Sequence, residues 1–325
     1  MANIVVTISA DDEQHEALIG RLSSFARVAF LRELSPAERA EELGKADVII
    51  SWSLGHELKP EEFARMGRLR FVQLLSAAAN QVPFSRIPAS VTVASNAGAY
   101  AEQMAEHVVA MILAARKNLI DRHDKLKQGI FDQSSKNRML QDSNCVILGF
   151  GGIGRITSRL LRCFGVRIYG INRTGKTSEP VDFIGTLKDL EHALRLADIV
   201  VVSLPLTKST RGLIGSRELG WMKDDVVLVN VARGDIIDEG ALYERLKTHP
   251  NFIAAIDAWW VEPLTHGEFR TSYPFMELPN VIGSPHNSAI VNGSSLKATM
   301  LAIENVKRFL NNEPIRGIVD RKDYE

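Results

Sequence analysis

The sequence lacks the features of several large classes of protein. Its 325 residues hold only two cysteines, Cys145 and Cys163, which both lie in apolar patterns and are expected to be buried small residues rather than a disulfide or metal pair. No group of histidine, cysteine and carboxylate residues has metal-ligand spacing, so no metal is expected. Basic and acidic residues balance at 39 each, which gives no electrostatic reason to expect nucleic acid or an acidic membrane as a partner.

Long hydrophobic runs are also missing. No apolar segment approaches the length that spans a bilayer, and the first residues have neither a basic leader nor a cleavage pattern. Together with the scarcity of cysteine, this predicts a cytoplasmic protein. The hydrophobic content of 45% and charged content of 24% are those of an ordinary folded protein, and the length allows two domains with substantial cores.

The first part of the chain alternates short apolar runs with helical patterns. This rhythm predicts a parallel sheet covered by helices. Helix starts are indicated by a serine and proline at 35–36, before an amphipathic stretch at 38–43, and by a proline at the start of 60–66. The expected strands are 4–8, 28–31, 48–52, 71–75 and 91–94.

The later part of the chain repeats the pattern. A long apolar helix is expected at 101–119, and a last helix at 294–311 would return to the first domain. We therefore predict an α/β protein of two doubly wound parallel-sheet domains: a dinucleotide-binding Rossmann domain at 99–290, and a flavodoxin-like substrate domain at 1–98 and 291–325, with ligands in the cleft between them. The expected strands here are 145–148, 166–171, 199–204, 226–231, 252–256 and 281–283.

A glycine-rich turn joins the first strand of this second half to an amphipathic helical stretch. The turn reads Gly149-Phe150-Gly151-Gly152-Ile153-Gly154, and its G-x-G-x-x-G spacing is that of a dinucleotide-binding turn. Gly149 permits the tight turn, Gly151 lets the backbone approach the pyrophosphate, and Gly154 allows close packing of helix on strand. The turn therefore predicts a nicotinamide or flavin dinucleotide.

The end of the next strand bears on which dinucleotide binds. An acidic residue there would bind the ribose hydroxyls of NAD, but the chain has Asn172, Arg173 and Thr174. Arg173 offers a charged fork and Thr174 a hydroxyl donor to a 2′-phosphate, while Asn172 adds no repulsion, so NADP is favoured and NAD stays possible. A solvated basic turn without a ligand is the alternative interpretation.

Three ionisable residues follow strands of the same predicted sheet. Arg233, Glu262 and His286 come after the strands at 226–231, 252–256 and 281–283, which places them on one rim. Reduction of a carbonyl needs a cation that holds the substrate and a proton donor that matches the hydride, and Arg233 and His286 are of those types. Glu262 is suited to orient the imidazole and favour its charged form.

At these residues the chain resembles the D-isomer-specific 2-hydroxyacid dehydrogenases. The segments 229–239, 255–263 and 284–288 look like the three signature segments of that family, in its order and spacing, and the similarity covers most of the chain after residue 98. The resemblance implies that Arg233 binds the 2-oxo acid, His286 exchanges a proton with the substrate oxygen and Glu262 pairs with His286. It also implies a cofactor lining, with Asp257 near the nicotinamide amide. That lining would be formed by Leu204, Pro205, Thr210, Val231, Ala232 and Asp257.

The first domain departs from the family pattern. A loop with Ala77, Ala78 and Ala79 stands where the family usually has a glycine-containing loop whose amides hold the substrate carboxylate, so these three residues are the expected substrate contacts. Two tryptophans, Trp259 and Trp260, replace what is often one phenylalanine and a variable residue. The pocket is therefore expected to be unusual.

The sequence thus predicts an NADP-preferring D-2-hydroxyacid dehydrogenase that reduces a small 2-oxo acid such as glyoxylate or hydroxypyruvate. A longer 2-oxo acid or a sugar acid stays open, and a homodimer is implied by the family and by the apolar helix at 101–119. One alternative is a non-catalytic NAD(P)(H)-sensing protein on the same scaffold. Another is an enzyme acting on phosphite or formate, although formate enzymes usually have Gln where this chain has Glu262.

Overall fold

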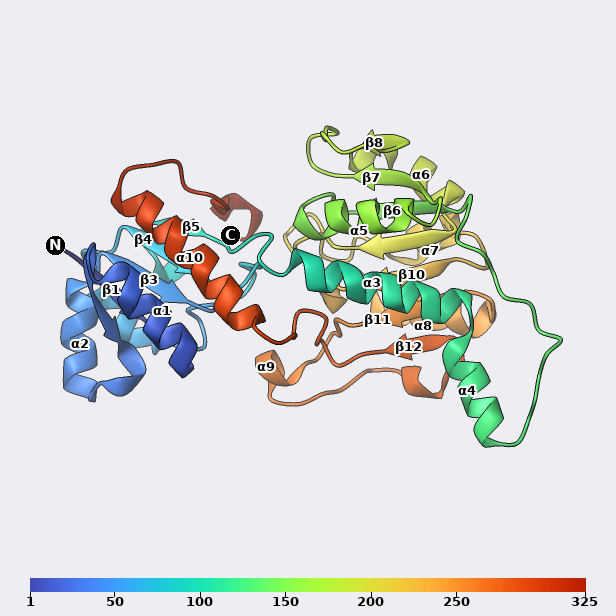
Figure 1. The fold of residues 1–325 in the computed structure, drawn as a ribbon, viewed down its shortest axis with the longest axis horizontal. Helices are drawn as coiled ribbons and strands as arrows, with labels where there is room; N and C mark the ends of the chain where they lie inside the picture. The colour runs from blue at the N-terminus through green and yellow to red at the C-terminus, as the bar shows by residue number, and fades with distance from the viewer. The chain divides into compact units, whose positions relative to one another are not determined.

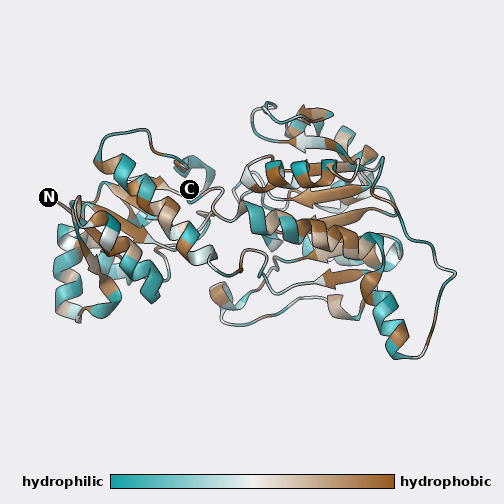
Figure 2. Ribbon diagram, in the orientation of Figure 1, coloured by the Kyte–Doolittle hydropathy of each residue, from teal (hydrophilic) through white to brown (hydrophobic).

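The computed structural model describes residues 1–325, which form two compact units. Unit 1 consists of Met1–Tyr100 with Val291–Glu325, and unit 2 of Ala101–Ile290 (Figure 1). In both units the strands carry the most hydrophobic residues and the helices show one hydrophobic and one hydrophilic side (Figure 2). No helix of the chain combines the length and the apolar character that crossing a membrane requires.

Unit 1 is built on a five-stranded, wholly parallel sheet in the order β2-β1-β3-β4-β5. This is the order of flavodoxin-like folds, so the prediction for the first domain is confirmed. The strands are largely buried on both faces, as is typical of parallel sheets, except that one edge strand is partly exposed. They are β1 (Ala2–Val6), β2 (Ala26–Phe30), β3 (Val48–Ser51), β4 (Phe71–Leu74) and β5 (Thr92–Ala94).

Helices cover both faces of this sheet. On one face, α1 (Asp12–Leu22) and α10 (Ser294–Leu310) bury a core with alternate residues of β1 and β3, and the other face packs against α2 (Pro36–Lys45). Two expectations needed correction: α1 was not foreseen, and the helix expected at 60–66 is a 3₁₀ turn, η2 (Pro60–Arg65). The remaining short 3₁₀ turns are η1 (Leu31–Glu33), η3 (Phe84–Arg86) and η7 (Arg321–Asp323).

Unit 2 is built on a seven-stranded parallel sheet in the order β12-β11-β10-β9-β6-β7-β8. The chain leaves β6 towards one edge and returns to β9 on its other side, so the strand order reverses between β6 and β9. Ligands of such sheets bind at this switch point, beyond the carboxyl ends of the strands. The strands are β6 (Asn144–Leu148), β7 (Arg167–Ile171), β8 (Phe183–Gly185), β9 (Ile199–Val202), β10 (Val227–Asn230), β11 (Ile253–Ile256) and β12 (Val281–Gly283).

The helices of unit 2 confirm the doubly wound architecture. The helix expected at 101–119 is shorter, because Asn118 adopts the left-handed region with φ 49° and divides it into α3 (Ala101–Arg116) and α4 (Leu119–Lys127). Cys145 is buried as expected, but Cys163 is exposed, since it follows the last residue of α5 on the solvent side. The other elements are α5 (Gly152–Arg162), η4 (Leu187–Asp189), α6 (Leu190–Leu196), α7 (Ser216–Trp221), η5 (Gly234–Ile236), α8 (Glu239–Thr248), α9 (Pro263–His266) and η6 (Phe275–Glu277).

Candidate active site

The glycine turn lies at the switch point of unit 2, between β6 and α5. Gly149 has φ 97°, and a Cβ on it would lie 2.6 Å from the backbone nitrogen of Leu204 in the loop after β9. A Cβ on Gly154 would lie 2.3 Å from the carbonyl oxygen of Gly149. Both positions therefore require glycine, because no side chain fits where the helix, the turn and the neighbouring loop meet.

Gly151 differs from these two glycines. A Cβ on it would meet nothing within 4 Å, so the side of the turn that it faces is open. The eleven-residue helix α5 begins with Gly152 and Ile153. Its N-cap residue is Gly151, which has no side chain that could cap the helix. An open backbone surface at a helix N-terminus suits a pyrophosphate, so the turn fits a dinucleotide. The ring of Phe150 is buried against Gly170 of β7. Only the backbone of Phe150 is therefore available to a ligand.

The turn after β7 is organised by Asn172. Its side-chain oxygen accepts hydrogen bonds from the amides of Thr174 (3.0 Å) and Gly175 (2.7 Å), and its side-chain nitrogen donates to the carbonyl of Lys176 (2.9 Å). Arg173 and Thr174 are exposed at the tip of this turn. A basic and a hydroxyl side chain thus stand together on a rigid turn at the carboxyl end of β7.

The loops after β9 and β10 continue the same rim. Thr210 is buried, and its hydroxyl donates to the carbonyl of Pro205 (2.6 Å), which ties the loop that begins at Leu204. After β10, Val231 and Ala232 are buried, so these two residues offer a ligand mainly their backbone.

Glu262 and His286 form a hydrogen-bonded pair. The loops after β11 and β12 bring the Glu262 Oε2 atom to 2.7 Å from His286 Nδ1, and Oε1 of the same carboxylate accepts the amide of Trp259 at 2.6 Å. Burial raises the pKa of Glu262, but the bonds from His286 and Trp259 and the charges of His286 and Arg233 outweigh it and hold the pKa below its ordinary value. The carboxylate is therefore ionised at neutral pH and faces Nδ1 of the imidazole.

Arg233 directly follows the short loop after β10 and is half-buried. Its Nη1 atom donates to the carbonyl of Ala232 at 2.6 Å, and its own carbonyl accepts from the side chain of Asn230 at 3.0 Å. The next residue, Gly234, lies against the backbone of Trp259: a Cβ there would be 2.4 Å from that residue's carbonyl carbon. Glycine thus lets the Arg233 loop press directly on the loop that leads to Glu262.

Asp257 is fully buried under the His286 loop. Its Oδ1 accepts from Ser284 Oγ (2.6 Å) and from the amide of Asn287 (3.1 Å), and its Oδ2 accepts from the amide of Ser288 (3.3 Å). Burial raises the pKa of Asp257, yet these bonds and the nearby imidazoles lower it overall. A buried carboxylate therefore holds the loop on both sides of His286.

The alanine loop belongs to unit 1, where it follows β4. Ala77 is exposed and Ala78 half-buried, but Ala79 packs into the core with 2% of its surface accessible. Ser76 Oγ donates to the carbonyl of Ala78 at 2.6 Å and so fixes the loop. Any contact that Ala79 makes with a ligand must come from its backbone.

Unit 2 therefore brings Arg233, Glu262 and His286 together at the carboxyl ends of adjacent strands. One further residue of this region, for which the sequence interpretation proposed no catalytic or binding role, is His107 on α3, whose Nε2 atom lies 3.1 Å from Ser284 Oγ. The only available signal was its place in the Ala105-Glu106-His107 segment, which does not reveal a contact with a loop far along the chain.

Known proteins match this chain over most of its length. Residues 109–288 match the family model described as "D-isomer specific 2-hydroxyacid dehydrogenase, NAD binding domain". D-3-phosphoglycerate dehydrogenase of Methanocaldococcus jannaschii is 28% identical over 322 residues, which make up 97% of this chain but only 60% of that protein. Glyoxylate reductase of Aeropyrum pernix is 31% identical over 240 residues, 71% of this chain and 70% of that protein. A crystal structure described as a putative formate dehydrogenase from Pyrobaculum aerophilum superposes with a TM-score of 0.83 at 29% identity and covers 100% of both chains.

Proposed function

The chain belongs to the D-isomer specific 2-hydroxyacid dehydrogenase family, and from this premise we propose that it is an NADP-preferring reductase of small 2-oxo acids. The observation that carries the proposal is the pairing of His286 with an ionised Glu262 on the rim that also holds Arg233. Such a pair maintains a proton donor beside a cation that can bind a carboxylate.

We propose an atom for each role. Because Nδ1 of His286 is held by Glu262 at 2.7 Å, Nε2 is the ring nitrogen left to exchange a proton with the substrate oxygen. The guanidinium of Arg233 binds the substrate carboxylate and polarises the 2-oxo carbonyl with its planar fork. A nicotinamide bound at the glycine turn would supply the hydride, and His286 Nε2 would donate the proton that completes the hydroxyl group of the product. Amides of the loop at Ala77, Ala78 and Ala79 are also proposed as substrate contacts.

The dinucleotide is held by the backbone of the glycine turn and by the loops that begin at Leu204 and Val231. The preference for NADP rests on Arg173 and Thr174, which stand on a turn ordered by Asn172. A 2′-phosphate would receive a charge-assisted bond from Arg173, whereas the hydroxyl of NAD would meet no acidic partner among these three residues.

The substrate is proposed to be glyoxylate or hydroxypyruvate. Two of the matched relatives are named glyoxylate reductase and hydroxypyruvate reductase, and a third is named D-3-phosphoglycerate dehydrogenase but is much longer than this chain. Formate is a second candidate, because the structural neighbour from Pyrobaculum aerophilum is described as a putative formate dehydrogenase. Glu262 opposes that candidate, since a formate reaction releases carbon dioxide and needs no imidazolium to donate a proton.

The test is an initial-rate screen in which NADPH and NADH are each combined with glyoxylate, hydroxypyruvate and longer 2-oxo acids. In a second arm of the screen, the oxidation of formate and of phosphite is assayed with NADP⁺ and with NAD⁺. We expect turnover of at least one short 2-oxo acid with NADPH, and its loss in His286→Ala with cofactor binding retained. Turnover only in the formate or phosphite arm, or dinucleotide binding without any turnover, would reject the proposal.

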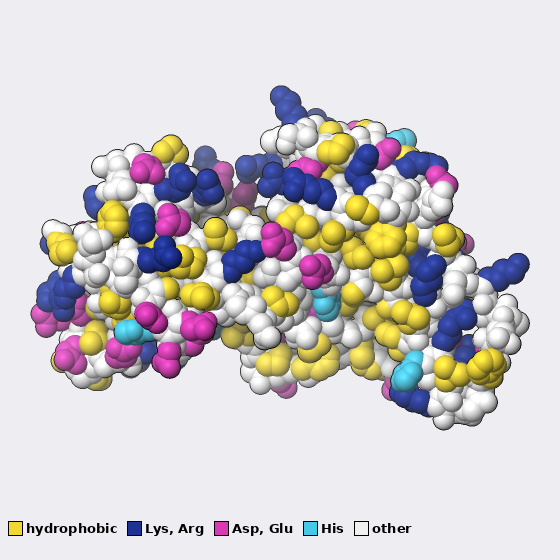
Figure 3. All heavy atoms as spheres, in the orientation of Figure 1, with side chains coloured by type: hydrophobic (Ala, Val, Ile, Leu, Met, Phe, Trp, Pro, Cys, Tyr) yellow, Lys and Arg dark blue, Asp and Glu magenta, His cyan; other side chains and the backbone are white.

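We also propose that the protein forms a homodimer through unit 2. Helix α4 has no buried residue, and it leads into a projecting segment that exposes apolar side chains, including Phe131 (73%) and Met139 (66%) (Figure 1). Hydrophobic side chains also gather over α3 and α5 on the face shown in Figure 3. Exposed apolar surface of this extent is typical of a protein interface.

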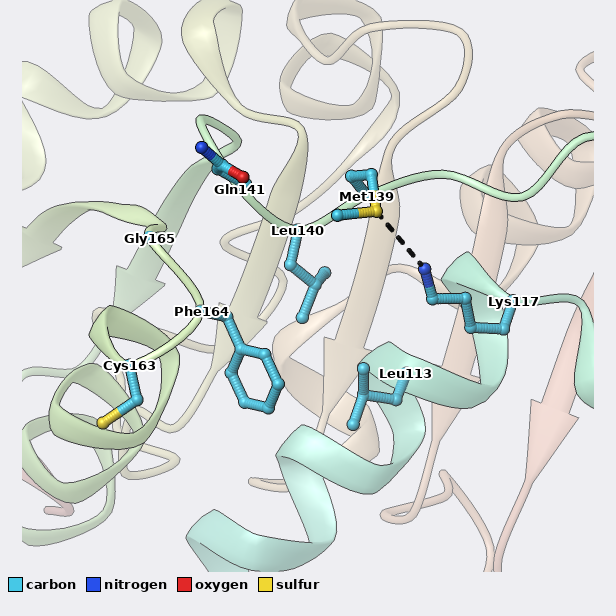
Figure 4. A pocket seen from close by; sticks show the side chains of 8 residues that line it. All are labelled: Leu113, Lys117, Met139, Leu140, Gln141, Cys163, Phe164 and Gly165. Atoms are coloured by element: carbon cyan, nitrogen blue, oxygen red, sulfur yellow. Dashed lines mark hydrogen bonds between the residues drawn. The ribbon is translucent and has the colours of Figure 1, made fainter.

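A groove on the same unit is suited to receive such a segment. It lies between the end of α3, loop residues 139–141 and the turn after α5, and the side chains of Leu113, Leu140 and Phe164 line it (Figure 4). The groove and the projecting segment belong to the same unit. In two copies related by a twofold axis, each copy can therefore place its projecting segment in the groove of the other.

Molar mass measured by light scattering tests this interface. Phe131→Asp should shift the protein from dimer to monomer, whereas Met276→Asp, a matched change at a residue exposed to 58% elsewhere in unit 2, should not. A monomeric wild type, or a dimer that survives Phe131→Asp together with Met139→Asp, would refute the proposed interface.

A further inference from the structure

His107 connects helix α3 to the loop that carries His286. Its Nε2 atom lies 3.1 Å from Ser284 Oγ and 3.8 Å from Asp257 Oδ1, and 26% of its side chain is exposed. Ser284 follows β12, so this contact joins two segments that lie 177 residues apart in the chain. No part of the mechanism above uses His107.

The direction of each hydrogen bond in this cluster can be assigned. Ser284 Oγ carries a single hydrogen and lies 2.6 Å from Asp257 Oδ1, an ionised oxygen that can only accept. The hydroxyl therefore donates to Asp257, which leaves its lone pairs for His107. Nε2 of His107 must then carry a hydrogen and donate to Ser284. The result is a relay from imidazole to hydroxyl to carboxylate.

The end of this relay holds the backbone beside His286. Asp257 accepts the amides of Asn287 and Ser288, while the indole nitrogen of Trp259 donates to the carbonyl of Ser284 at 2.8 Å. His286 itself has φ 50°, a left-handed conformation that residues other than glycine seldom adopt. The backbone around it must therefore be held from outside to stay in place.

We infer that His107 is a positioning residue for His286, acting through Ser284 and Asp257. By donating to Ser284 it keeps the hydroxyl directed at Asp257, so that the carboxylate stays aligned with the loop amides. This inference rests on the proposed function for its kinetic consequence, but the arrangement of the loop can be tested without any substrate.

Four variants separate a positioning role from a merely structural one. His107→Phe keeps a ring but loses the donor, His107→Gln restores an N–H donor of similar reach, and Ser284→Ala breaks the relay at its middle. With a 2-oxo acid and NADPH, His107→Phe and Ser284→Ala should each lower kcat by about fivefold to twentyfold, the worth of one hydrogen bond. His107→Gln should recover kcat to within about threefold of wild type, and the double variant His107→Phe/Ser284→Ala should be no worse than the poorer single variant. The dissociation constant of NADPH should stay within about twofold throughout, because the relay acts on the loop and not on the glycine turn.

The control is His123→Phe, the same substitution at an exposed histidine on α4, which should leave kcat unchanged. If His107→Gln is as impaired as His107→Phe, or if the two lesions multiply in the double variant, the relay is refuted.

A second readout does not depend on turnover. In the imidazole proton spectrum of ¹⁵N-histidine-labelled protein, the Nδ1 proton of His286, identified by its loss in His286→Gln, should be sharp in the wild type and in His107→Gln. It should be broadened in His107→Phe and in Ser284→Ala. An unchanged resonance in both of these variants would overturn the inference. If the wild type reduces no 2-oxo acid, the proposed function fails, while this spectrum still decides the role of His107.

Discussion

The replacement of Glu262 by glutamine tests the proton-donating pair most directly. In reduction the competent form of His286 is the imidazolium, so the rate should fall as pH rises and the ring loses its proton. Glutamine keeps the size of the side chain and can still accept the amide of Trp259, but it removes the charge 2.7 Å from Nδ1. Its amide N–H instead favours a ring nitrogen without a proton at Nδ1.

The size of the effect follows from the geometry of the pair. The Glu262 side chain is only 15% exposed, so solvent screens the interaction weakly, and a hydrogen bond between charged partners in such a place contributes about 1.5–3 kcal/mol. Loss of that contribution destabilises the imidazolium, so the alkaline limb of kcat/KM should move towards lower pH. Oxidation of the 2-hydroxy acid needs the neutral ring and should become active at lower pH than in the wild type.

The assay is the pH dependence of kcat/KM for the 2-oxo acid at saturating NADPH, measured for both proteins and in both reaction directions. Glu262→Asp, which keeps the charge but shortens the side chain, serves as the comparison and should lose rate without the full shift of the limb. A profile of Glu262→Gln that coincides in pH with that of the wild type would refute the pairing. The carboxylate would then have a role towards Trp259 alone.

Four further outcomes are expected. Arg233→Lys should lower kcat/KM for the 2-oxo acid by about a hundredfold or more while NADPH binding, followed by fluorescence titration, stays within a fewfold; an equal loss of both would make Arg233 structural. Arg173→Ala should raise the KM for NADPH about tenfold or more and leave that for NADH nearly unchanged, since a charge-assisted phosphate contact contributes about 1.5–3 kcal/mol. Gly154→Ala should lower the free energy of unfolding, measured by urea titration, by about 1–3 kcal/mol, because the added methyl group has no room. In Gly151→Ala the added methyl group meets open space, so this variant should bind the cofactor more weakly but keep its stability. Because the pKa of Glu262 is lowered in the folded protein, the ionised carboxylate stabilises the fold above about pH 4.3, and this stabilisation is lost as pH falls further. The difference in Tm between the wild type and Glu262→Gln should therefore shrink below about pH 4.

The parts of the fold that sequence predicted are those with local causes. The positive φ of Gly149 belongs to the turn itself, and Gly154 is required by its contact with the nearby Gly149, so both signals are local even though Gly149 also approaches the distant Leu204. The type of sheet was predictable, because a chain that alternates apolar runs with helical patterns can adopt only a few sheet topologies. The strand β8 was missed, since three residues at a sheet edge give too short a pattern to distinguish from a loop.

Other errors come from contacts that no local pattern records. The break between α3 and α4 depends on the left-handed conformation of Asn118, which a continuous apolar periodicity conceals. The burial of the Ala79 side chain was likewise not indicated by the sequence, because it depends on the loop after β4 folding back on the core of unit 1. No local pattern indicates the contact of His107, because its partner, Ser284, lies in the loop after β12, near the end of unit 2.

The conformation of His286 explains why so many hydrogen bonds converge on one loop. A left-handed backbone costs a residue with a Cβ about 1–2 kcal/mol, and glycine, which would avoid that cost, has no imidazole. The loop must therefore keep a histidine in an unfavourable conformation, with its ring directed at Glu262. The hydrogen bonds that Asp257 accepts from the amides of Asn287 and Ser288, and the one that Trp259 donates to the carbonyl of Ser284, offset the cost. A buried carboxylate beneath a strained histidine is thus a structural requirement of placing an imidazole on this rim, and it makes the residues that orient that carboxylate sensitive positions for the chemistry above it.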